Sequence, residues 1–192
     1  MQKLFTYFAL VLLLSCNQQK QEPVALPSNS IFHLQSNWYT QDNEKIQLKD
    51  LKGKTLVVVM IYTSCKSACP RLVANMKTIA QQIPEKQLAK TSLVLITIDP
   101  ETDRPKQLKE FARVNEMEEK HWTFLTGDVE GTQELANVLA MKYKKISPID
   151  FSHSNIISIF SADGQMKFQE EGLDIDTKKI AEMVRSVAKN NS

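Results

Sequence analysis

Apolar residues fill three short segments of this chain without interruption, and between those segments they recur at intervals of three and four residues. The runs over residues 55–62 and 92–98 are rich in β-branched side chains, and residues 122–125 form a shorter third run. Unbroken apolar runs of this length are typical of strands that are buried on both faces of a parallel sheet. The pattern therefore predicts three core strands joined by helices.

Each of these strands is followed by a segment with helical spacing. The first helix ends at Pro84, the second begins at Asp103-Arg104-Pro105 with Asp103 as its N-cap, and the third covers about residues 130–141. Their apolar positions are Leu72, Val73, Met76, Ile79, Ala80 and Ile83, then Leu108, Phe111 and Ala112, then Leu135, Val138 and Leu139.

The two ends of the chain predict further elements. Residues 155–160 and 165–169 read as short strands around a Ser161-Ala-Asp163-Gly164 turn, and a last helix carries Ile180 and Val184. Near the start, residues 31–34 and 45–51 flank a polar turn and predict an opening β-hairpin.

The predicted order of elements is β-α-β-α-β-α-β-β-α, an α/β arrangement in which helical crossovers build a parallel sheet. An antiparallel hairpin and a covering helix complete it. Cys65 and Cys69 lie between the first core strand and its helix. A βαβ start, a ββα finish and paired cysteines at this position form the ground plan of the thioredoxin fold, here with an αβ insertion. We expect one domain of this fold over residues 31–192.

Residues 1–15 have the pattern of a secretory signal, with Lys3 ahead of an apolar stretch. The stretch is shorter than the about 20 residues that a helix needs to cross a bilayer. It closes with Leu13-Leu14-Ser15-Cys16, which resembles the lipobox of bacterial lipoproteins. We therefore expect cleavage before Cys16, a lipid on Cys16 and a flexible tether over residues 16–30. The protein would then be exported and anchored at the extracytoplasmic, periplasmic side of a membrane.

Charge excludes nucleic-acid binding. The 24 Lys and Arg residues are interleaved with 22 Asp and Glu residues, so the net charge is only +2 and no basic stripe forms. The cysteine count is also informative, because assigning Cys16 to the lipid leaves a single pair, Cys65 and Cys69.

This pair lies at the carboxyl edge of the predicted sheet, where ligands usually bind. Residues four apart on a helix have Cβ atoms about 5 to 6 Å apart, so a disulfide and a shared metal are both within reach of Cys65 and Cys69. A helix N-terminus next to Lys66 and Arg71 favours the thiolate, which attacks disulfides and binds metals. A purely stabilising disulfide is the plainer alternative, but it would close too short a loop to add much stability.

A third ligand would distinguish metal chemistry from redox chemistry, and the chain has three histidines. His33 and His121 fit surface or capping positions. His153 directly precedes the fourth core strand, in a loop that lies beside the first helix in a thioredoxin-like topology. Two thiolates and an imidazole suit copper in both oxidation states, whereas a structural zinc site usually has four protein ligands.

Three motifs in this order resemble the Sco (SenC) family of copper chaperones. They are C-x-x-x-C-P ending at Pro70, the segment Thr97-Ile-Asp99-Pro100-Glu-Thr-Asp103, and His153-Ser154. The resemblance runs over about residues 31–172.

The resemblance implies a thioredoxin-like fold that binds Cu(I) or Cu(II) through Cys65, Cys69 and His153. It also implies a role in building the dinuclear copper centre of cytochrome c oxidase subunit II, with that subunit or another copper enzyme as the partner. Asp99 and Asp103 match the family's acidic loop, for which we expect a supporting role.

This chain departs from many relatives at Ser152, where an acidic residue often precedes the histidine. A neighbouring carboxylate orients an imidazole ligand and strengthens its binding, and Asp150 is the candidate substitute. A second function stays open, that of a thiol-disulfide reductase that keeps the copper-ligand cysteines of a partner reduced. In that function one cysteine of the pair attacks, the other resolves the mixed disulfide, and His153 is dispensable.

Overall fold

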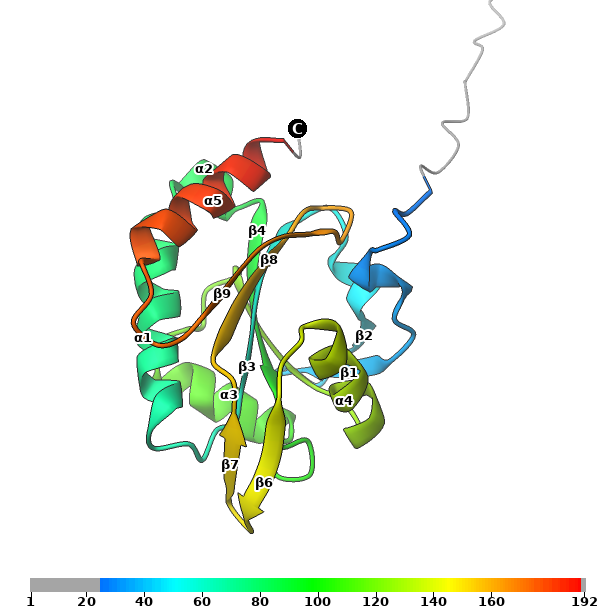
Figure 1. The fold of residues 1–192 in the computed structure, drawn as a ribbon, viewed down its shortest axis with the longest axis vertical. Helices are drawn as coiled ribbons and strands as arrows, with labels where there is room; N and C mark the ends of the chain where they lie inside the picture. Colours follow the sequence, from blue (N-terminus) through cyan, green and yellow to red (C-terminus); the bar gives the residue numbers. More distant parts are fainter. Residues whose placement is uncertain (1–24, 191–192) are drawn as a thin grey trace, which may run out of the picture.

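The computed structural model describes residues 25–190, which form a seven-stranded sheet with helices on both faces (Figure 1). The strand order is β2-β1-β5-β4-β3-β8-β9. The predicted signal peptide, the predicted lipid site at Cys16 and most of the tether lie outside the described residues. Among residues 25–190, no helix has both the length and the apolar character needed to cross a membrane. The strands of this sheet are β1 (Asn37–Thr40), β2 (Lys45–Gln47), β3 (Thr55–Ile61), β4 (Thr91–Thr97), β5 (Trp122–Thr126), β8 (Ile156–Phe160) and β9 (Met166–Glu171).

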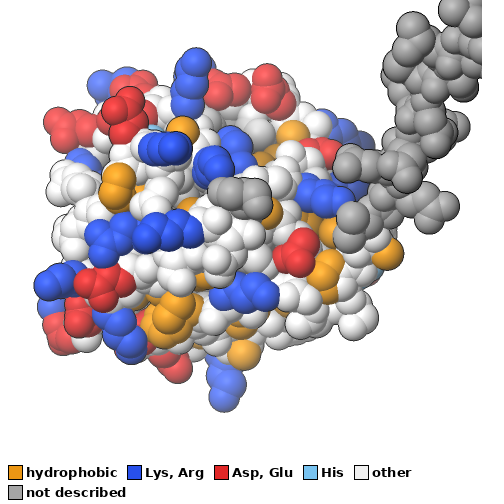
Figure 2. Space-filling view, turned by 90° about the horizontal axis from the view of Figure 1, so that it is seen from above, with side chains coloured by type: hydrophobic (Ala, Val, Ile, Leu, Met, Phe, Trp, Pro, Cys, Tyr) orange, Lys and Arg blue, Asp and Glu red, His pale blue; other side chains and the backbone are white. Residues whose placement is uncertain are grey.

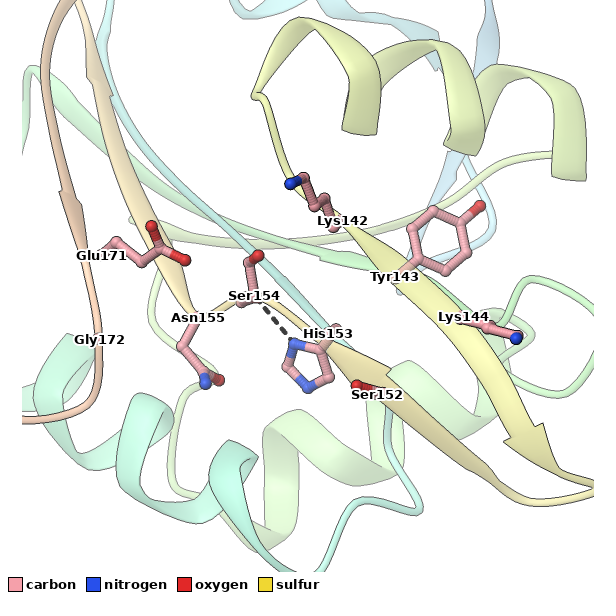
Figure 3. Close-up of a pocket in the computed structure, with 9 residues that line it drawn as sticks. All are labelled: Lys142, Tyr143, Lys144, Ser152, His153, Ser154, Asn155, Glu171 and Gly172. Carbon is pink, nitrogen blue, oxygen red and sulfur yellow. Dashed lines mark hydrogen bonds between the residues drawn. The ribbon is translucent and has the colours of Figure 1, made fainter.

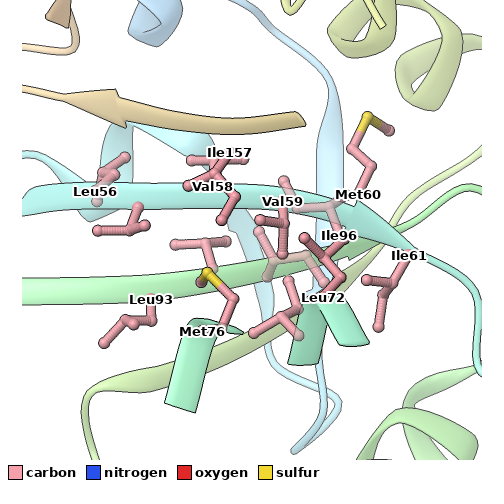
Figure 4. Packing of buried hydrophobic residues seen from close by; sticks show 14 of the residues in the cluster. Leu56, Val58, Val59, Met60, Ile61, Leu72, Met76, Leu93, Ile96 and Ile157 are labelled. Carbon is pink, nitrogen blue, oxygen red and sulfur yellow. The ribbon is translucent and has the colours of Figure 1, made fainter. Parts of the chain in front are cut away.

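Strands β3, β4 and β5 form the parallel centre of the sheet, as the apolar runs predict. Every residue of β3 and β4 is buried, because β-branched and aliphatic side chains leave both faces of these strands and meet helices there. Figure 4 shows Leu72 and Met76 of α1 (Ala68–Gln81) among the buried side chains of β3 and β4. The two cysteines therefore lie next to the deeply buried core, at the end of β3 and the beginning of α1.

The helices cover the two faces unequally. Figure 1 shows α1, the short α2 (Glu85–Leu88) and the C-terminal α5 (Thr177–Lys189) together on one side of the sheet and α4 (Val129–Val138) on the other. Right-handed crossovers place α1 and α3 (Pro105–Val114) on the same face, because β3, β4 and β5 are added in one direction. The predicted α/β arrangement is confirmed, with α3, β5 and α4 inserted between the βαβ start and the ββα finish. Figure 2 shows basic and acidic side chains interspersed over one face of the molecule.

The opening hairpin exists, but its first arm is not where the sequence pattern placed it. Residues 31–34 were expected to form a strand, whereas Ile31–His33 is a 3-10 helix (η1) and Leu48–Leu51 is another (η2). The hairpin consists of β1 and β2, which pair from Asn37 with Gln47 to Tyr39 with Lys45. The prediction was wrong because the buried residues of η1 follow no strand alternation, and Ser30 caps them as a short helix.

A second hairpin was missed. Strands β6 (Tyr143–Ser147) and β7 (Asp150–His153) pair with each other and form a separate two-stranded sheet. Four of the five residues of β6 are exposed, so no apolar alternation marks this strand in the sequence. His153 was expected in a loop, but it is the last residue of β7. Figure 1 shows this hairpin projecting beyond the end of the main sheet.

The chain enters the domain at the turn between β8 and β9. The Ser30 hydroxyl donates to the Asp163 carbonyl oxygen at 2.6 Å, and the Ile31 N–H donates to the Gly164 carbonyl oxygen at 3.0 Å. Gly164 has a φ of +82°, and a Cβ atom there would lie 2.4 Å from the Ser30 hydroxyl oxygen. Only glycine allows this close approach. In Figure 1 this turn and the β6–β7 hairpin lie at opposite ends of the molecule.

Candidate metal centre

Cys65 lies in the loop that follows β3, and Cys69 lies in the first turn of α1. Their side chains are nearly buried, with 8% of Cys65 and 1% of Cys69 exposed. Both thiols are free, and the Cys69 backbone N–H donates to the Cys65 sulfur at 3.3 Å. The first turn of α1 thus directs at Cys65 an N–H group that has no acceptor within the helix.

The two thiols differ in acidity. Burial alone would raise the pKa of Cys65, but hydrogen bonds from the Cys69 and Ser67 backbone and from neighbouring side chains outweigh it and lower the pKa to about 6. Burial raises the pKa of Cys69 well above its usual range, and the neighbouring Cys65 raises it further. At neutral pH, Cys65 is therefore the thiolate and Cys69 is the protonated thiol. The Arg71 guanidinium, which was expected to favour the thiolate, forms an ion pair with Asp174.

His153 joins the two cysteines from a distant part of the chain. One sulfur atom from each cysteine and one ring nitrogen of His153 all lie within 4.8 Å of one another. Within residues 25–190, this is the only group of three or more cysteine, histidine or acidic side chains arranged to hold a metal. His153 Nδ1 donates to the Ser154 carbonyl oxygen at 2.9 Å, as Figure 3 shows, so Nε2 keeps its lone pair for a ligand.

Asp150, the candidate substitute for a carboxylate beside His153, makes no hydrogen bond to the His153 ring. The Asp150 carboxylate accepts a hydrogen bond from the Tyr62 hydroxyl, and the carbonyl oxygen of Ser154 orients the imidazole. Tyr62 packs edge-on against the His153 ring, with 5.7 Å between centroids and 83° between planes. Burial, followed by the hydrogen bond to Asp150, raises the pKa of Tyr62, so its hydroxyl remains a donor.

Asp103 holds the loop that carries Cys65. The Asp103 side chain is buried, and its carboxylate accepts from the Thr63 N–H at 2.9 Å, from the Thr97 hydroxyl at 2.6 Å and from the Thr63 hydroxyl. The prediction that Asp103 caps the second helix was wrong, since the N-cap of α3 is Arg104. The carboxylate faces the cysteine loop because Thr63 and Thr97 offer it donors at the ends of two neighbouring strands.

Asp99 is also buried, and its backbone shapes the turn that delivers Asp103. The Asp99 N–H donates to the Thr97 hydroxyl at 2.9 Å, and its carbonyl oxygen accepts from the N–H groups of Thr102 and Asp103. Sequence reasoning missed Tyr62, Thr63 and Thr97 as neighbours of the site. The position of each at the carboxyl end of a core strand was the available signal.

The other two histidines lie apart from this group. A ring nitrogen of His33 is 2.9 Å from the Pro27 carbonyl oxygen, and the His121 ring packs against Trp122 with 5.2 Å between centroids. Burial lowers the pKa of His121. These contacts agree with the surface and capping positions that were expected for them.

An open cavity of about 410 Å³ borders the histidine. Figure 3 shows the His153 ring together with the residues of this cavity, which come from β6 and the residue before it, from β7 and the segment after it, and from the end of β9. They are Lys142, Tyr143, Lys144, Ser152, His153, Ser154, Asn155, Glu171 and Gly172. The histidine side of the cluster is thus reachable from solvent, whereas Cys69 is enclosed.

Comparison with known proteins identifies the family that the sequence of this chain matches. The family model for SCO1/SenC matches residues 29–189. A SCO1 protein homolog of Bacillus subtilis (strain 168) is 33% identical over 87 residues, which are 45% of this chain and 45% of that protein. The match therefore spans less than half the length of this relative.

Solved structures share the fold over most of their length. The copper-bound ScoI of Arabidopsis thaliana has a TM-score of 0.71 at 20% identity, covering 81% of this chain and 96% of that one. A SCO1/SenC family lipoprotein from Bacillus anthracis has a TM-score of 0.72 at 24% identity, with 79% and 92% covered. BsSco, described as a Sco family cytochrome c oxidase assembly protein with a disulfide switch, has a TM-score of 0.68 at 27% identity, with 79% and 90% covered. At such identities, these likenesses establish the thioredoxin-like fold.

Proposed function

Because this chain belongs to the SCO1/SenC family, we propose that it binds one copper ion through Cys65, Cys69 and His153 and delivers it to a copper enzyme. The observation that carries the proposal is the convergence of two sulfur atoms and one ring nitrogen within 4.8 Å. The donor set fits copper, because thiolates suit Cu(I) and an added imidazole suits Cu(II). The low pKa of Cys65, about 6, supplies one thiolate at neutral pH without cost.

Delivery requires a site that can release its metal. Three protein ligands leave a coordination position for an incoming ligand, and the cavity beside His153 gives access to the cluster. The target that we propose is subunit II of cytochrome c oxidase, where the dinuclear copper centre is assembled. BsSco, which shares the fold, is described as an assembly protein of this oxidase.

We further propose that Cys16 carries a lipid and holds the domain at the periplasmic side of a membrane. The Leu13-Leu14-Ser15-Cys16 sequence supports this, as does the similarity to a family lipoprotein from Bacillus anthracis. Metabolic labelling with a radioactive fatty acid tests it. The wild-type protein should be labelled and a C16S variant should not.

Copper titration tests the central proposal. The full chain with C16S, which removes the third thiol, is reduced, titrated anaerobically with Cu(I) and then oxidised. We expect one copper per chain and a thiolate-to-Cu(II) charge-transfer band. C65A and C69A should lose affinity for both Cu(I) and Cu(II), whereas H153A should lose far more affinity for Cu(II) than for Cu(I). Weak or non-stoichiometric binding by the C16S protein would rule out the copper site.

The difference between the two thiols favours a thiol-disulfide reductase as the second candidate. The Cys65 thiolate would attack a partner disulfide, forming a mixed disulfide and releasing one partner thiolate. Cys69 would then lose its proton and attack the Cys65 sulfur, which forms the Cys65–Cys69 disulfide and releases the second partner thiolate. Two electrons pass to the partner. Rapid reduction of a model disulfide by H153A would support this function, and a sluggish wild type would count against it.

A further inference from the structure

The hairpin that carries His153 has no strand of the main sheet beside it. Within residues 25–190, β6 and β7 pair only with each other, so their position beside the cysteines depends on their covalent links to α4 and β8 and on side-chain contacts. Two such contacts come from the loop between β3 and α1. The Ser64 hydroxyl donates to the Ile149 carbonyl oxygen at 3.2 Å, and the Tyr62 hydroxyl donates to the Asp150 carboxylate.

Tyr62 connects the hairpin to the cysteine loop. Its side chain is buried, and its ring lies 5.2 Å from that of Phe151 and 5.7 Å from that of His153. Its carbonyl oxygen accepts from the Cys65 N–H at 3.2 Å. The Tyr62 hydroxyl also lies 3.4 Å from the Phe151 carbonyl oxygen, so both of its acceptors belong to β7. A buried hydroxyl without an acceptor is unfavourable, so this group favours the hairpin position in which β7 receives it.

We propose that Tyr62 and Asp150 are positioning residues, whose hydrogen bond holds the β6–β7 hairpin against the cysteine loop and so fixes where His153 meets the two sulfur atoms. The inference rests on the proposed copper site and deepens it. Cu(I) is satisfied by the two thiolates, whereas Cu(II) also uses the imidazole. We therefore expect the Tyr62–Asp150 bond to strengthen the binding of Cu(II) more than the binding of Cu(I).

The first test needs no metal. Hydrogen–deuterium exchange is measured on the reduced, metal-free full chain as wild type and with Asp150→Ala, Asp150→Asn and Asp42→Ala. Asp150→Asn keeps an oxygen that can accept from Tyr62. Asp42→Ala is the matched control, because it removes an exposed carboxylate that pairs with Lys109, far along the chain from the hairpin.

We expect amide exchange in β6 and β7 to become about tenfold faster in Asp150→Ala, as for a segment that has lost a specific contact. Asp150→Asn should lie near the wild type, and Asp42→Ala should match it. Exchange in α5 should be the same in all four proteins. Unchanged hairpin exchange in Asp150→Ala would overturn the inference.

The second test measures Cu(II) and Cu(I) affinities of the same variants. Loss of a group that orients a ligand typically costs 10- to 100-fold in metal affinity, so we expect Asp150→Ala to bind Cu(II) about tenfold more weakly. Cu(I) affinity should stay within about twofold, because the thiolates remain. The electron paramagnetic resonance spectrum of bound Cu(II) should broaden in Asp150→Ala and return to the wild-type form in Asp150→Asn.

Tyr62→Phe separates this role from a direct effect on the cysteines. It removes the same hydrogen bond but also alters the surroundings of Cys65. If Tyr62→Phe lowers the affinity for Cu(II) while Asp150→Ala does not, Tyr62 acts through Cys65 and the positioning role is overturned. A wild type that binds no Cu(II) overturns the proposed function. A wild type that binds normally beside an unchanged Asp150→Ala overturns only the inference.

Discussion

Strand β3 buries all seven of its residues, whereas β6 exposes four of its five. Both strands position a part of the same cluster. β3 and α1 bring Cys65 and Cys69 together on a packed core, and the β6–β7 hairpin brings His153 with a few polar contacts and one buried ring, Phe151. The two cysteines are thus held by burial of apolar area, and His153 is held by specific hydrogen bonds. The two parts of the site should respond differently to mutation.

The largest effect is expected in the core. Leu72 is fully buried where α1 packs on β3, so L72A leaves a cavity and lowers the free energy of unfolding by about 2 to 5 kcal/mol. Urea denaturation measures the loss. V114A, at an exposed position of α3, is the control and should change stability by less than about 0.5 kcal/mol. A loss below about 1 kcal/mol for L72A would contradict rigid packing beneath the cysteines.

A smaller effect is expected at the join between the core and the cysteine loop. D103A leaves the Thr63 N–H and the hydroxyls of Thr63 and Thr97 without their acceptor, and it should lower the free energy of unfolding by about 2 kcal/mol. D103N keeps one acceptor oxygen and should lose less. Urea denaturation of both variants measures this, and equal losses would mean that the acceptor oxygen retained in D103N does not stabilise the loop.

The acidity of Cys65 distinguishes the two cysteines of the cluster. With a pKa of about 6, its thiolate fraction and hence its alkylation rate should rise about tenfold between pH 5 and pH 7 and level off above that. Iodoacetamide labelling followed by peptide mass spectrometry measures the profile, and C65S is the control. A midpoint near pH 9 would show that the N–H groups around Cys65 do not lower its pKa.

The lowered pKa of Cys65 also makes the stability of the protein depend on pH. The pKa of Cys65 is lower in the folded protein than in the unfolded chain, so the unfolded state binds more protons between the two values. The contribution of Cys65 to stability is therefore present at high pH and is lost as the pH falls through about 6. Comparing the reduced wild type with C65S from pH 5 to pH 8 isolates this contribution.

The smallest effect is expected at the tip of the hairpin. Ile149 is 73% exposed, so I149S should change the free energy of unfolding by less than about 0.5 kcal/mol. It should also leave the Ser64 contact in place, because that contact uses the Ile149 carbonyl oxygen. Urea denaturation tests this, and a loss comparable to that of L72A would mean that the hairpin belongs to the core.

The same contrast explains which parts of the structure could be predicted. The core strands were predicted to within about one residue, because continuous burial leaves an unbroken apolar run in the sequence. The helical stripe of α1 was also recognised, although this helix ends at Gln81, before the predicted end at Pro84. The β6–β7 hairpin was missed because Lys144 and Lys145 face solvent, and its strands follow no period. The first arm of the opening hairpin was misplaced because Ile31 and Phe32 are buried from a 3-10 turn.

The candidate site divides in the same way. Cys65, Cys69 and His153 could be named from motifs, and the structure brings them together. Their polar neighbours could not be assigned, because hydrogen-bond partners depend on the tertiary arrangement of side chains. The Asp150 carboxylate accepts a hydrogen bond from Tyr62 and makes none to His153. The Asp103 carboxylate accepts from Thr63 and does not cap the beginning of α3. The sequence does not show which hydrogen-bond donor a carboxylate will contact, so both side chains were assigned the wrong partner.

The amino-terminal segment is attached to the β8–β9 turn, at the end of the molecule opposite the cluster. Ser30 and Ile31 bind Asp163 and Gly164 at one end, while the hairpin and the cysteine loop lie at the other, as Figure 1 shows. If the amino-terminal segment is held at a surface, the cluster lies at the end of the domain that is farther from the point of attachment.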